Sequence, residues 1–206
     1  MKILRVILIG IAAVGVAYMA YAVIVYFPAR PIAIVMPPEP APAQKILTKE
    51  AVGKPTLLSI PSLRVSARIQ EVGLTTAGAM ANPQGPNKFR ETGWYKDGPR
   101  PGQAGSAVID GHLDNALGFD GVFIHLNRLK AGDTVQIKTD QNELLTFVVL
   151  DQQTYDYTHA PNAEIFTRNN GTARLNLITC DGTWIQSIKS YDKRLVVYTE
   201  LISITP

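Results

Sequence analysis

From residue 55 onward the sequence is a succession of short apolar segments separated by glycine- and proline-containing turns, and this pattern restricts the fold most. The segments expected to be strands are residues 56–60, 67–72, 91–95, 104–112, 134–139, 144–150, 174–180 and 194–202. Helical spacing is rare: Phe123, Leu126 and Leu129 recur every third residue and predict one short helical turn. About eight short strands joined by turns predict an all-β domain, either a closed barrel or a sandwich.

The N-terminal part contains a long uncharged apolar stretch, residues 6–27. As a helix it would rise about 33 Å, enough to cross a hydrocarbon core of about 30 Å. Lys2 and Arg5 precede it, so the positive-inside rule places the stub in the cytoplasm and everything after residue 27 outside. The alternative is a cleaved signal peptide, because residues 20–22 (Ala-Tyr-Ala) have the small-x-small form. The apolar stretch continues past that point, which favours a retained single-pass anchor in the cell membrane.

A proline-rich segment follows the apolar stretch. Residues 28–43 hold six prolines and show no strand or helix period. Such a segment favours polyproline II and would form a semi-rigid stalk of about 50 Å, although a plain disordered linker fits equally well. We therefore expect a cytoplasmic stub and transmembrane anchor over residues 1–27, an extracellular stalk over 28–54 and a folded catalytic domain over 55–206.

Composition excludes several classes of function. The net charge is +3 and the basic residues are scattered, so no Lys/Arg stripe indicates a nucleic-acid partner. One cysteine and three dispersed histidines lack the spacing of a zinc site. No glycine-rich phosphate loop and no Gly-x-Ser-x-Gly motif is present. We predict neither a metal nor a cofactor.

Cys180 is the only cysteine of the chain and closes an apolar strand pattern. Outside the cytoplasm disulfides are common, but a single cysteine cannot form an internal one, so it is either buried and inert or kept for its reactivity. Side chains alternate across a strand, so Cys180 shares a face with Arg174, Asn176 and Ile178. The two polar neighbours indicate a face that looks toward a groove or solvent.

Two further reactive groups are expected at strand termini. His112 ends the strand pattern 104–112, and Arg194 opens the pattern 194–202. Side chains at strand ends converge at the rim of a β-scaffold, where a thiolate nucleophile needs an acid/base partner and a cation. The sequence thus predicts a site built from Cys180, His112 and Arg194.

Other candidates for these roles are weaker. Arg174 lies six residues from Cys180 on the same strand, about 20 Å away, so it cannot contact the same substrate atom. His125 falls beside the apolar Phe123/Leu126/Leu129 stripe and is expected to face solvent. His159 lies in a long connection with no predicted strand.

The order and spacing of these motifs resemble the sortase family, the membrane-anchored cysteine transpeptidases of mainly Gram-positive bacteria. The resemblance covers residues 55–202. It rests on residues 111–114 (Gly-His-Leu-Asp), on 177–180 (Leu-Ile-Thr-Cys) and on Arg194 before a Leu-Val-Val strand. Residues 93–95 and the Pro-Gly-rich segment 98–105 are most similar to the class F or class D branches.

The resemblance implies an eight-stranded sortase-type β-barrel with short helices, preceded by one N-terminal transmembrane helix. It further implies that Cys180 is the nucleophile, that His112 is the acid/base partner and that Arg194 binds the oxyanion or the substrate. The strand that carries the family's cysteine often has threonine where this chain has Asn176. That departure concerns substrate contacts more than chemistry.

Further roles are expected around these three residues. We expect substrate contacts from Asn176, Ile178 and Thr179, and Asp110 or Asp114 as the group that orients His112. The calcium-binding acidic residues of some class A sortases have no counterpart that we can assign.

The implied reaction is cleavage of an LPxTG-like sorting signal through a thioacyl-enzyme. The acyl group then passes to an amine, either of a cell-wall precursor or of a pilin lysine. The partners are thus surface proteins that carry sorting signals, the amine acceptor and the membrane. Alternatives are a hydrolytic cysteine protease and a catalytically idle, membrane-tethered binding module. An L,D-transpeptidase is disfavoured because its Ser-His-Gly-Cys motif is absent.

Overall fold

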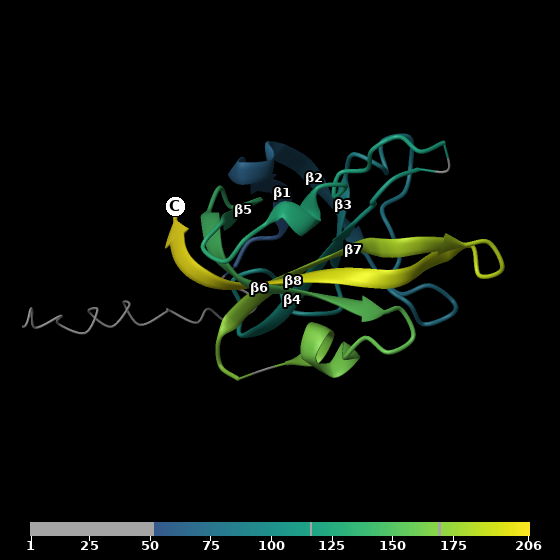
Figure 1. The fold of residues 1–206 in the computed structure, drawn as a ribbon. Helices are drawn as coiled ribbons and strands as arrows, with labels where there is room; N and C mark the ends of the chain where they lie inside the picture. The colour runs from purple at the N-terminus through teal and green to yellow at the C-terminus, as the bar shows by residue number, and fades with distance from the viewer. Residues whose placement is uncertain (1–51, 116, 169) are drawn as a thin grey trace, which may run out of the picture. The chain divides into compact units, whose positions relative to one another are not determined.

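Eight strands close into a barrel in the computed structural model, which describes residues 52–115, 117–168 and 170–206 (Figure 1). The strands are β1 (Pro55–Ile60), β2 (Val65–Val72), β3 (Thr92–Tyr95), β4 (Gly105–Gly111), β5 (Thr134–Thr139), β6 (Leu144–Asp156), β7 (Ala173–Ile185) and β8 (Ser190–Thr205). Short helical segments in this part of the chain are η2 (Pro61–Leu63), η3 (Leu126–Arg128) and η4 (Ala163–Thr167). The predicted all-β, eight-stranded barrel is confirmed.

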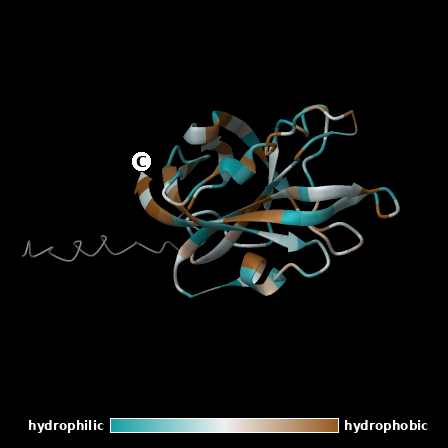
Figure 2. Ribbon diagram, viewed as in Figure 1, coloured by the Kyte–Doolittle hydropathy of each residue, from teal (hydrophilic) through white to brown (hydrophobic). Residues whose placement is uncertain are grey.

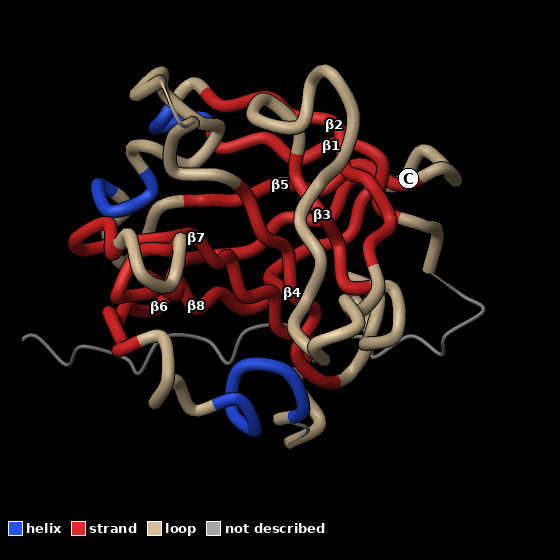
Figure 3. Tube along the Cα trace, turned by 90° about the vertical axis from the view of Figure 1, so that its right-hand side faces the viewer, coloured by secondary structure: helices blue, strands red, loops and turns tan. Residues whose placement is uncertain are grey.

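The strand order around the barrel determines which strand ends meet. Neighbours follow the order β1-β2-β3-β4-β7-β8-β6-β5, and all pair antiparallel except β2–β3 and β4–β7, which are parallel. Figure 3 shows how the strands form the wall of the barrel, with the helical segments outside this wall. Because β4 and β7 run in the same direction, their carboxyl-terminal ends lie at the same end of the barrel. His112 directly follows β4, and Cys180 lies in the carboxyl-terminal half of β7.

The barrel interior is a continuous apolar core. Inward side chains alternate with outward ones along the strands, as the pleat requires, and Figure 2 shows hydrophobic and hydrophilic residues mixed along them. Phe123, Leu126 and Leu129 close one part of this core around η3, which confirms the predicted short helical turn. The other fully enclosed members include Leu58, Ile60, Trp94, Ile109, Ile137, Leu145, Phe147, Leu175, Leu177 and Val197.

A second, smaller cluster lies on the outer face of β4, β7 and β8. Val108, Val196 and Tyr198 project outward from these strands, and Ile165 of η4 packs on them. η4 therefore covers part of the sheet from outside and forms a wall beside the strand ends. The polar face predicted for the cysteine strand is partly buried under this wall.

The predicted ends of the last two strands need a correction. β7 continues past Cys180 to Ile185, and β8 begins at Ser190, four residues before Arg194, so both residues lie inside a long hairpin. The register of this ladder shifts between Asp181 and Trp184, where Gly182 has a φ of 83°. Its positive φ suits glycine, which allows pairing to resume beyond it.

The folded unit starts earlier than the predicted stalk boundary at residue 54. Val52 is fully buried in the core, and its carbonyl accepts a hydrogen bond from Arg100 Nη1 at 2.7 Å. The barrel thus already includes Val52. The predicted anchor, residues 6–27, and the proline-rich residues 28–43 lie outside the described residues. Among the residues that are described, no helix is long and apolar enough to cross a membrane.

Candidate active site

His112, Cys180 and Arg194 form one row across the outer face of three neighbouring strands. Cys180 is directly opposite Arg194 in the β7–β8 ladder. Asp110 pairs with Ile178 in the parallel β4–β7 ladder, so His112, two residues after Asp110, reaches the level of Cys180. The sheet register therefore brings together the three groups that the sequence predicted at strand ends.

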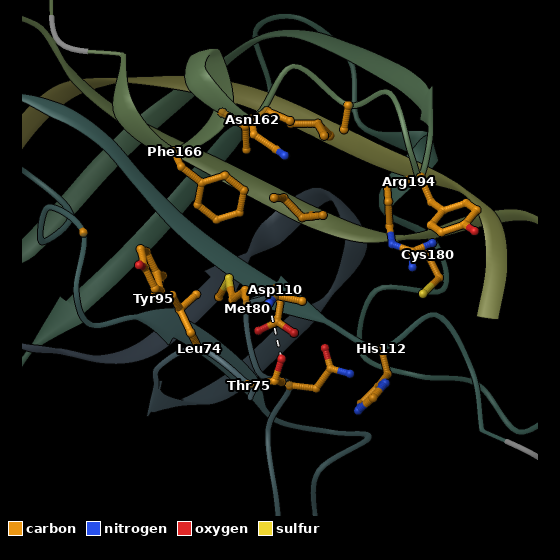
Figure 4. A pocket seen from close by; sticks show the side chains of 18 of the residues that line it. Leu74, Thr75, Met80, Tyr95, Asp110, His112, Asn162, Phe166, Cys180 and Arg194 are labelled. Carbon is orange, nitrogen blue, oxygen red and sulfur yellow. Dashed lines mark hydrogen bonds between the residues drawn. The ribbon is translucent and has the colours of Figure 1, made fainter. Parts of the chain in front are cut away.

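All three side chains line one large pocket (Figure 4). Its volume is about 1810 Å³, beyond the roughly 300–1,000 Å³ of a typical small-molecule site. Its floor beside the row of His112, Cys180 and Arg194 includes Ile178 and Val196, and its walls are the loop between β2 and β3 and the η4 segment. We call this part the groove; its apolar wall residues include Leu74, Met80, Tyr95, Ile165 and Phe166. The pocket is therefore large enough for a ligand bigger than a typical small molecule.

The thiol of Cys180 is half-buried and free. Burial raises its pKa above the ordinary value, the Arg194 charge opposes this shift, and the carboxylates of Asp114 and Asp110 add to it. Burial dominates, so the thiol stays protonated in the free protein. A reaction at this thiol needs a base that takes its proton during attack.

His112 is level with the thiol on the neighbouring strand, and no hydrogen bond joins the two side chains among the described residues. Its ring lies 4.8 Å from the Phe89 ring, measured between centroids. Burial lowers the pKa of His112, the Lys88 charge lowers it further, and Asp114 acts in the opposite direction. Its Nε2 is buried and makes no hydrogen bond with any described residue. A neutral imidazole with an available nitrogen can accept a proton from the thiol.

Arg194 is held by its own hairpin. Nη1 donates to the carbonyls of Tyr191 (2.9 Å) and Lys193 (2.7 Å), and Nη2 donates to Ser190 Oγ (2.8 Å). Its guanidinium carbon lies 5.9 Å from the centroid of the Tyr157 ring. A guanidinium has five N–H donors, so these bonds leave Nε–H and one Nη2–H for another acceptor. The positive charge of Arg194 is thus held next to the thiol, and two of its N–H groups can donate to a ligand.

The two predicted orienters of His112 lie at the site without bonding to the imidazole. Asp110 and Asp114 both line the pocket, yet no hydrogen bond joins either carboxyl to His112 among the described residues. Asp114 Oδ2 instead accepts a 2.5 Å hydrogen bond from the Tyr191 hydroxyl, which raises the pKa of Tyr191 to about 12. Asp114 therefore acts on His112 through its charge, not through a direct bond.

Two side chains predicted to contact the substrate, Asn176 and Thr179, are buried in the structure. Asn176 is fully buried under η4, where its Nδ2 donates to the Ile165 carbonyl at 2.7 Å. Thr179 is buried, and its hydroxyl donates to the Gly111 carbonyl at 2.8 Å, which links β7 to the end of β4. Both side chains are therefore enclosed in the fold, although Asn176 Oδ1 has no hydrogen-bond partner among the described residues. Ile178 does line the pocket.

The weaker candidates fall outside the site. Arg174 lies three rows from Cys180 and reaches Glu200 at 3.6 Å. His125 is exposed beside η3, as predicted, and His159 is exposed and bonded to Thr158. Within the part of the chain that the structure describes, no group of three or more His, Cys, Asp or Glu side chains could hold a metal ion.

Several functional neighbours escaped the sequence reasoning. Ser190 and Tyr191 hold Arg194 and Asp114, and Phe89 packs on His112. The assumption that a strand begins at Arg194 hid the first two.

Comparisons with known proteins agree with this geometry. A family model described as the sortase domain matches residues 58–202. Sortase A from Listeria monocytogenes superposes with a TM-score of 0.54 at 23% identity, over 74% of this chain and 90% of that one. The SrtA sortase from Actinomyces oris gives a TM-score of 0.56 at 18% identity, over 81% and 88%.

A third solved structure, sortase C-1 from Actinomyces oris, gives a TM-score of 0.53 at 22% identity, over 71% of each chain. At such identities the structures share the fold alone. A comparison with curated protein sequences found no match. The family model, however, spans well over half of the sequence and includes His112, Cys180 and Arg194. The chain therefore belongs to the sortase family.

Proposed function

We propose that this protein is an active sortase that cleaves an LPxTG-like sorting signal through a thioacyl-enzyme on Cys180 and transfers the acyl group to an amine. The observation that carries the proposal is the row of His112, Cys180 and Arg194 at one end of the groove. The family to which the chain belongs consists of cysteine transpeptidases. A row that places a base, a thiol and a cation side by side supplies what acyl transfer requires.

In the first step the thiol of Cys180 attacks the carbonyl carbon of the threonine in the signal. The S–H proton passes to His112 while the C–S bond forms, because both groups are neutral in the free protein. Negative charge then develops on the carbonyl oxygen. The two uncommitted N–H groups of Arg194 donate to that oxygen, a contribution of roughly 3 kcal/mol per donor in other acyl-transfer sites.

The intermediate collapses by breaking the carbon–nitrogen bond, and His112 gives its proton to the departing amine. The thioester then reacts with an incoming amine by the reverse sequence, in which His112 accepts a proton from the amine. The thiolate of Cys180 leaves and is reprotonated. Water in place of the amine gives hydrolysis, the reaction of the alternative cysteine protease.

The groove gives the bound peptide a direction. The side next to Ile178 and Val196 is apolar and suits the leucine and proline of the signal. The opposite side of the row is lined by polar groups, among them Asp114, Asn115 and Lys189. We therefore place the acyl part of the peptide along the apolar groove and the departing and incoming amines on the polar side.

The surroundings of the reaction follow from the sequence. We propose that residues 6–27 anchor the protein in the membrane as a single span, with residues 28–51 as the spacer and the barrel outside the cell. The acceptor would then be an amine at the cell surface, from a cell-wall precursor or a pilin lysine. The similarity to class F or class D sortases remains a prediction.

Acyl-enzyme trapping tests the proposal. Incubation of the protein with LPxTG-like peptides should give a mass increase equal to the acyl fragment, located on Cys180 by peptide mapping. Added glycine peptides should yield a new amide product, and the Cys180→Ala variant should give neither. A wild-type protein that forms no adduct with any peptide would point to the idle binding module. Adducts that pass only to water, even at high amine concentration, would point to the protease.

A further inference from the structure

The carboxyl of Asp110 occupies a defined space on the floor of the groove. It lies on the outward face of β4, two residues before His112 (Figure 4). Asp110 pairs with Ile178 on one side and with Gly93 on the other. A Cβ at position 93 would collide with Asp110 Oδ1, so the absence of a side chain at Gly93 creates the space for the carboxyl.

This carboxyl lacks a counter-ion. Its Oδ1 is buried and has no hydrogen-bond partner among the described residues, and no salt bridge of Asp110 occurs there. Burial raises the pKa of Asp110 to about 8, opposed only by the nearby backbone N–H groups of Asp110 and Gly93. A desolvated carboxyl without a partner carries a free-energy cost. A ligand that brings a positive charge removes this cost.

The surroundings of Asp110 favour ligands that bring a positive charge to its carboxyl. Figure 4 shows it between Met80 and Tyr95 on one side and His112 on the other. Ile178 lies beside it on the floor, and the residue as a whole keeps some exposure within the pocket. Because burial shields the Asp110 carboxyl from water, a charge pair formed there is stronger than one at the surface. A buried polar group also rejects ligands that leave it unpaired.

Asp110 is within reach of a defined part of the bound peptide. Two residues along a strand span about 7 Å, so Asp110 lies one such step from the row at which the scissile carbonyl binds. When an extended peptide binds with its threonine carbonyl at Cys180, the residue before that threonine lies close to Asp110. The long stems of lysine and arginine can lie along the apolar walls and deliver their charge to the floor.

We propose that Asp110 determines the specificity of the groove by binding a lysine or arginine side chain at the variable position of the sorting signal, the residue before the threonine. The inference rests on the proposed function for the identity of the peptide. It replaces the expected role of Asp110 as the orienter of His112.

Peptide binding to the full-length Cys180→Ala protein in detergent tests the inference without turnover. Three fluorescent peptides would differ only at the variable position, which carries lysine, norleucine or glutamate. The lysine peptide should bind more tightly than the norleucine peptide, by a factor on the order of ten or more, and the glutamate peptide should bind most weakly. Adding Asp110→Asn should remove this order, whereas adding Asp151→Asn, at an exposed carboxylate of β6, should keep it.

Acylation rates with the same peptides separate the two proposals. In the protein that retains Cys180, Asp110→Asn should lower the ratio of kcat/KM for the lysine peptide to kcat/KM for the norleucine peptide by on the order of tenfold. An equal loss for every peptide, or a wild-type protein indifferent to the charge of the peptide, would overturn the inference. Charge-dependent binding without any acyl-enzyme would instead contradict the proposed function and leave the role of Asp110 standing. The wild-type comparison needs no variant, so it holds even if Asp110→Asn folds poorly.

Discussion

Cys180 and Arg194 lie directly opposite each other in the antiparallel β7–β8 ladder. The hairpin carbonyls hold the guanidinium in place, and its charge lowers the pKa of the thiol against the larger, opposite effect of burial. The thiol therefore remains protonated at neutral pH. The guanidinium exerts its full effect only when negative charge appears on sulfur or on the substrate oxygen during the reaction.

Replacing Arg194 should test this relationship. Arg194→Gln should reduce the rate of acyl-enzyme formation by roughly 10²–10³-fold, the usual effect of losing an oxyanion donor. It should also raise the pKa of Cys180, because the opposing positive charge is gone. Rates by mass spectrometry and the pH dependence of thiol alkylation measure the two effects. Arg174→Gln, three rows away, is the matched control and should change neither; a comparable loss there would remove Arg194 from its role.

The pH profile should report the pair of His112 and Cys180. With a neutral peptide, kcat/KM should rise through a pKa below that of an ordinary histidine and fall through one above that of an ordinary cysteine. His112→Ala should slow acylation by roughly 10²–10⁴-fold and abolish the acid limb.

Two charge variants near His112 should shift the acid and alkaline limbs of this pH profile, the rise and the fall of kcat/KM, in different ways. Lys88→Gln should shift the acid limb to higher pH, because the Lys88 charge lowers the pKa of His112. Asp114→Asn should shift both limbs to lower pH, because its carboxylate raises the pKa of both His112 and Cys180. Limbs that stay in place in both variants would mean that other groups control the profile.

Asp110 should make stability depend on pH. Its pKa in the folded protein is about 8, against about 3.9 in an unfolded chain. The folded state therefore binds more protons between these values, and stability should fall as pH rises through this window. Asp110→Asn does not titrate, so its melting temperature relative to wild type should increase from pH 4 to pH 8 and level off above that. A difference that is constant with pH would show that the carboxyl titrates normally.

Val52 should stabilise the barrel although it precedes β1. Val52→Ala removes fully buried apolar atoms and should cost roughly 2 kcal/mol, a fall in melting temperature of several degrees. Lys54→Ala is the neighbouring control: its ion pair with Glu71 is exposed and should contribute little. If Val52→Ala were as stable as the wild type, Val52 would not contribute to the barrel, and the predicted boundary at residue 54 would stand.

Residues 1–51 should act as a spacer and not as a lid over the groove. The stalk region has no periodic apolar face that could dock there. A chain that begins at residue 52 should therefore cleave short peptides at the rate of the full-length protein in detergent. A large rise in rate on truncation would show that the N-terminal region covers the groove.

Local patterns in the sequence determined much of the architecture. The alternation of apolar residues and the turn chemistry predicted an all-β domain, because both depend only on neighbouring residues. The end of the strand pattern at His112 was predicted correctly, whereas the strand that carries Cys180 continues to Ile185. The motif order around them indicated the family, which the family model confirms.

Pairing between distant strands decided the rest. The parallel neighbours β4 and β7 set His112 level with Cys180, and the hairpin register placed Arg194 opposite the thiol within a strand that extends beyond both. Burial of Asn176 under η4 and of Thr179 against β4 removed two predicted substrate contacts. The solvation of Asp110 likewise depends on Gly93 across the sheet. Such contacts join residues far apart in sequence, so only the tertiary structure could establish them.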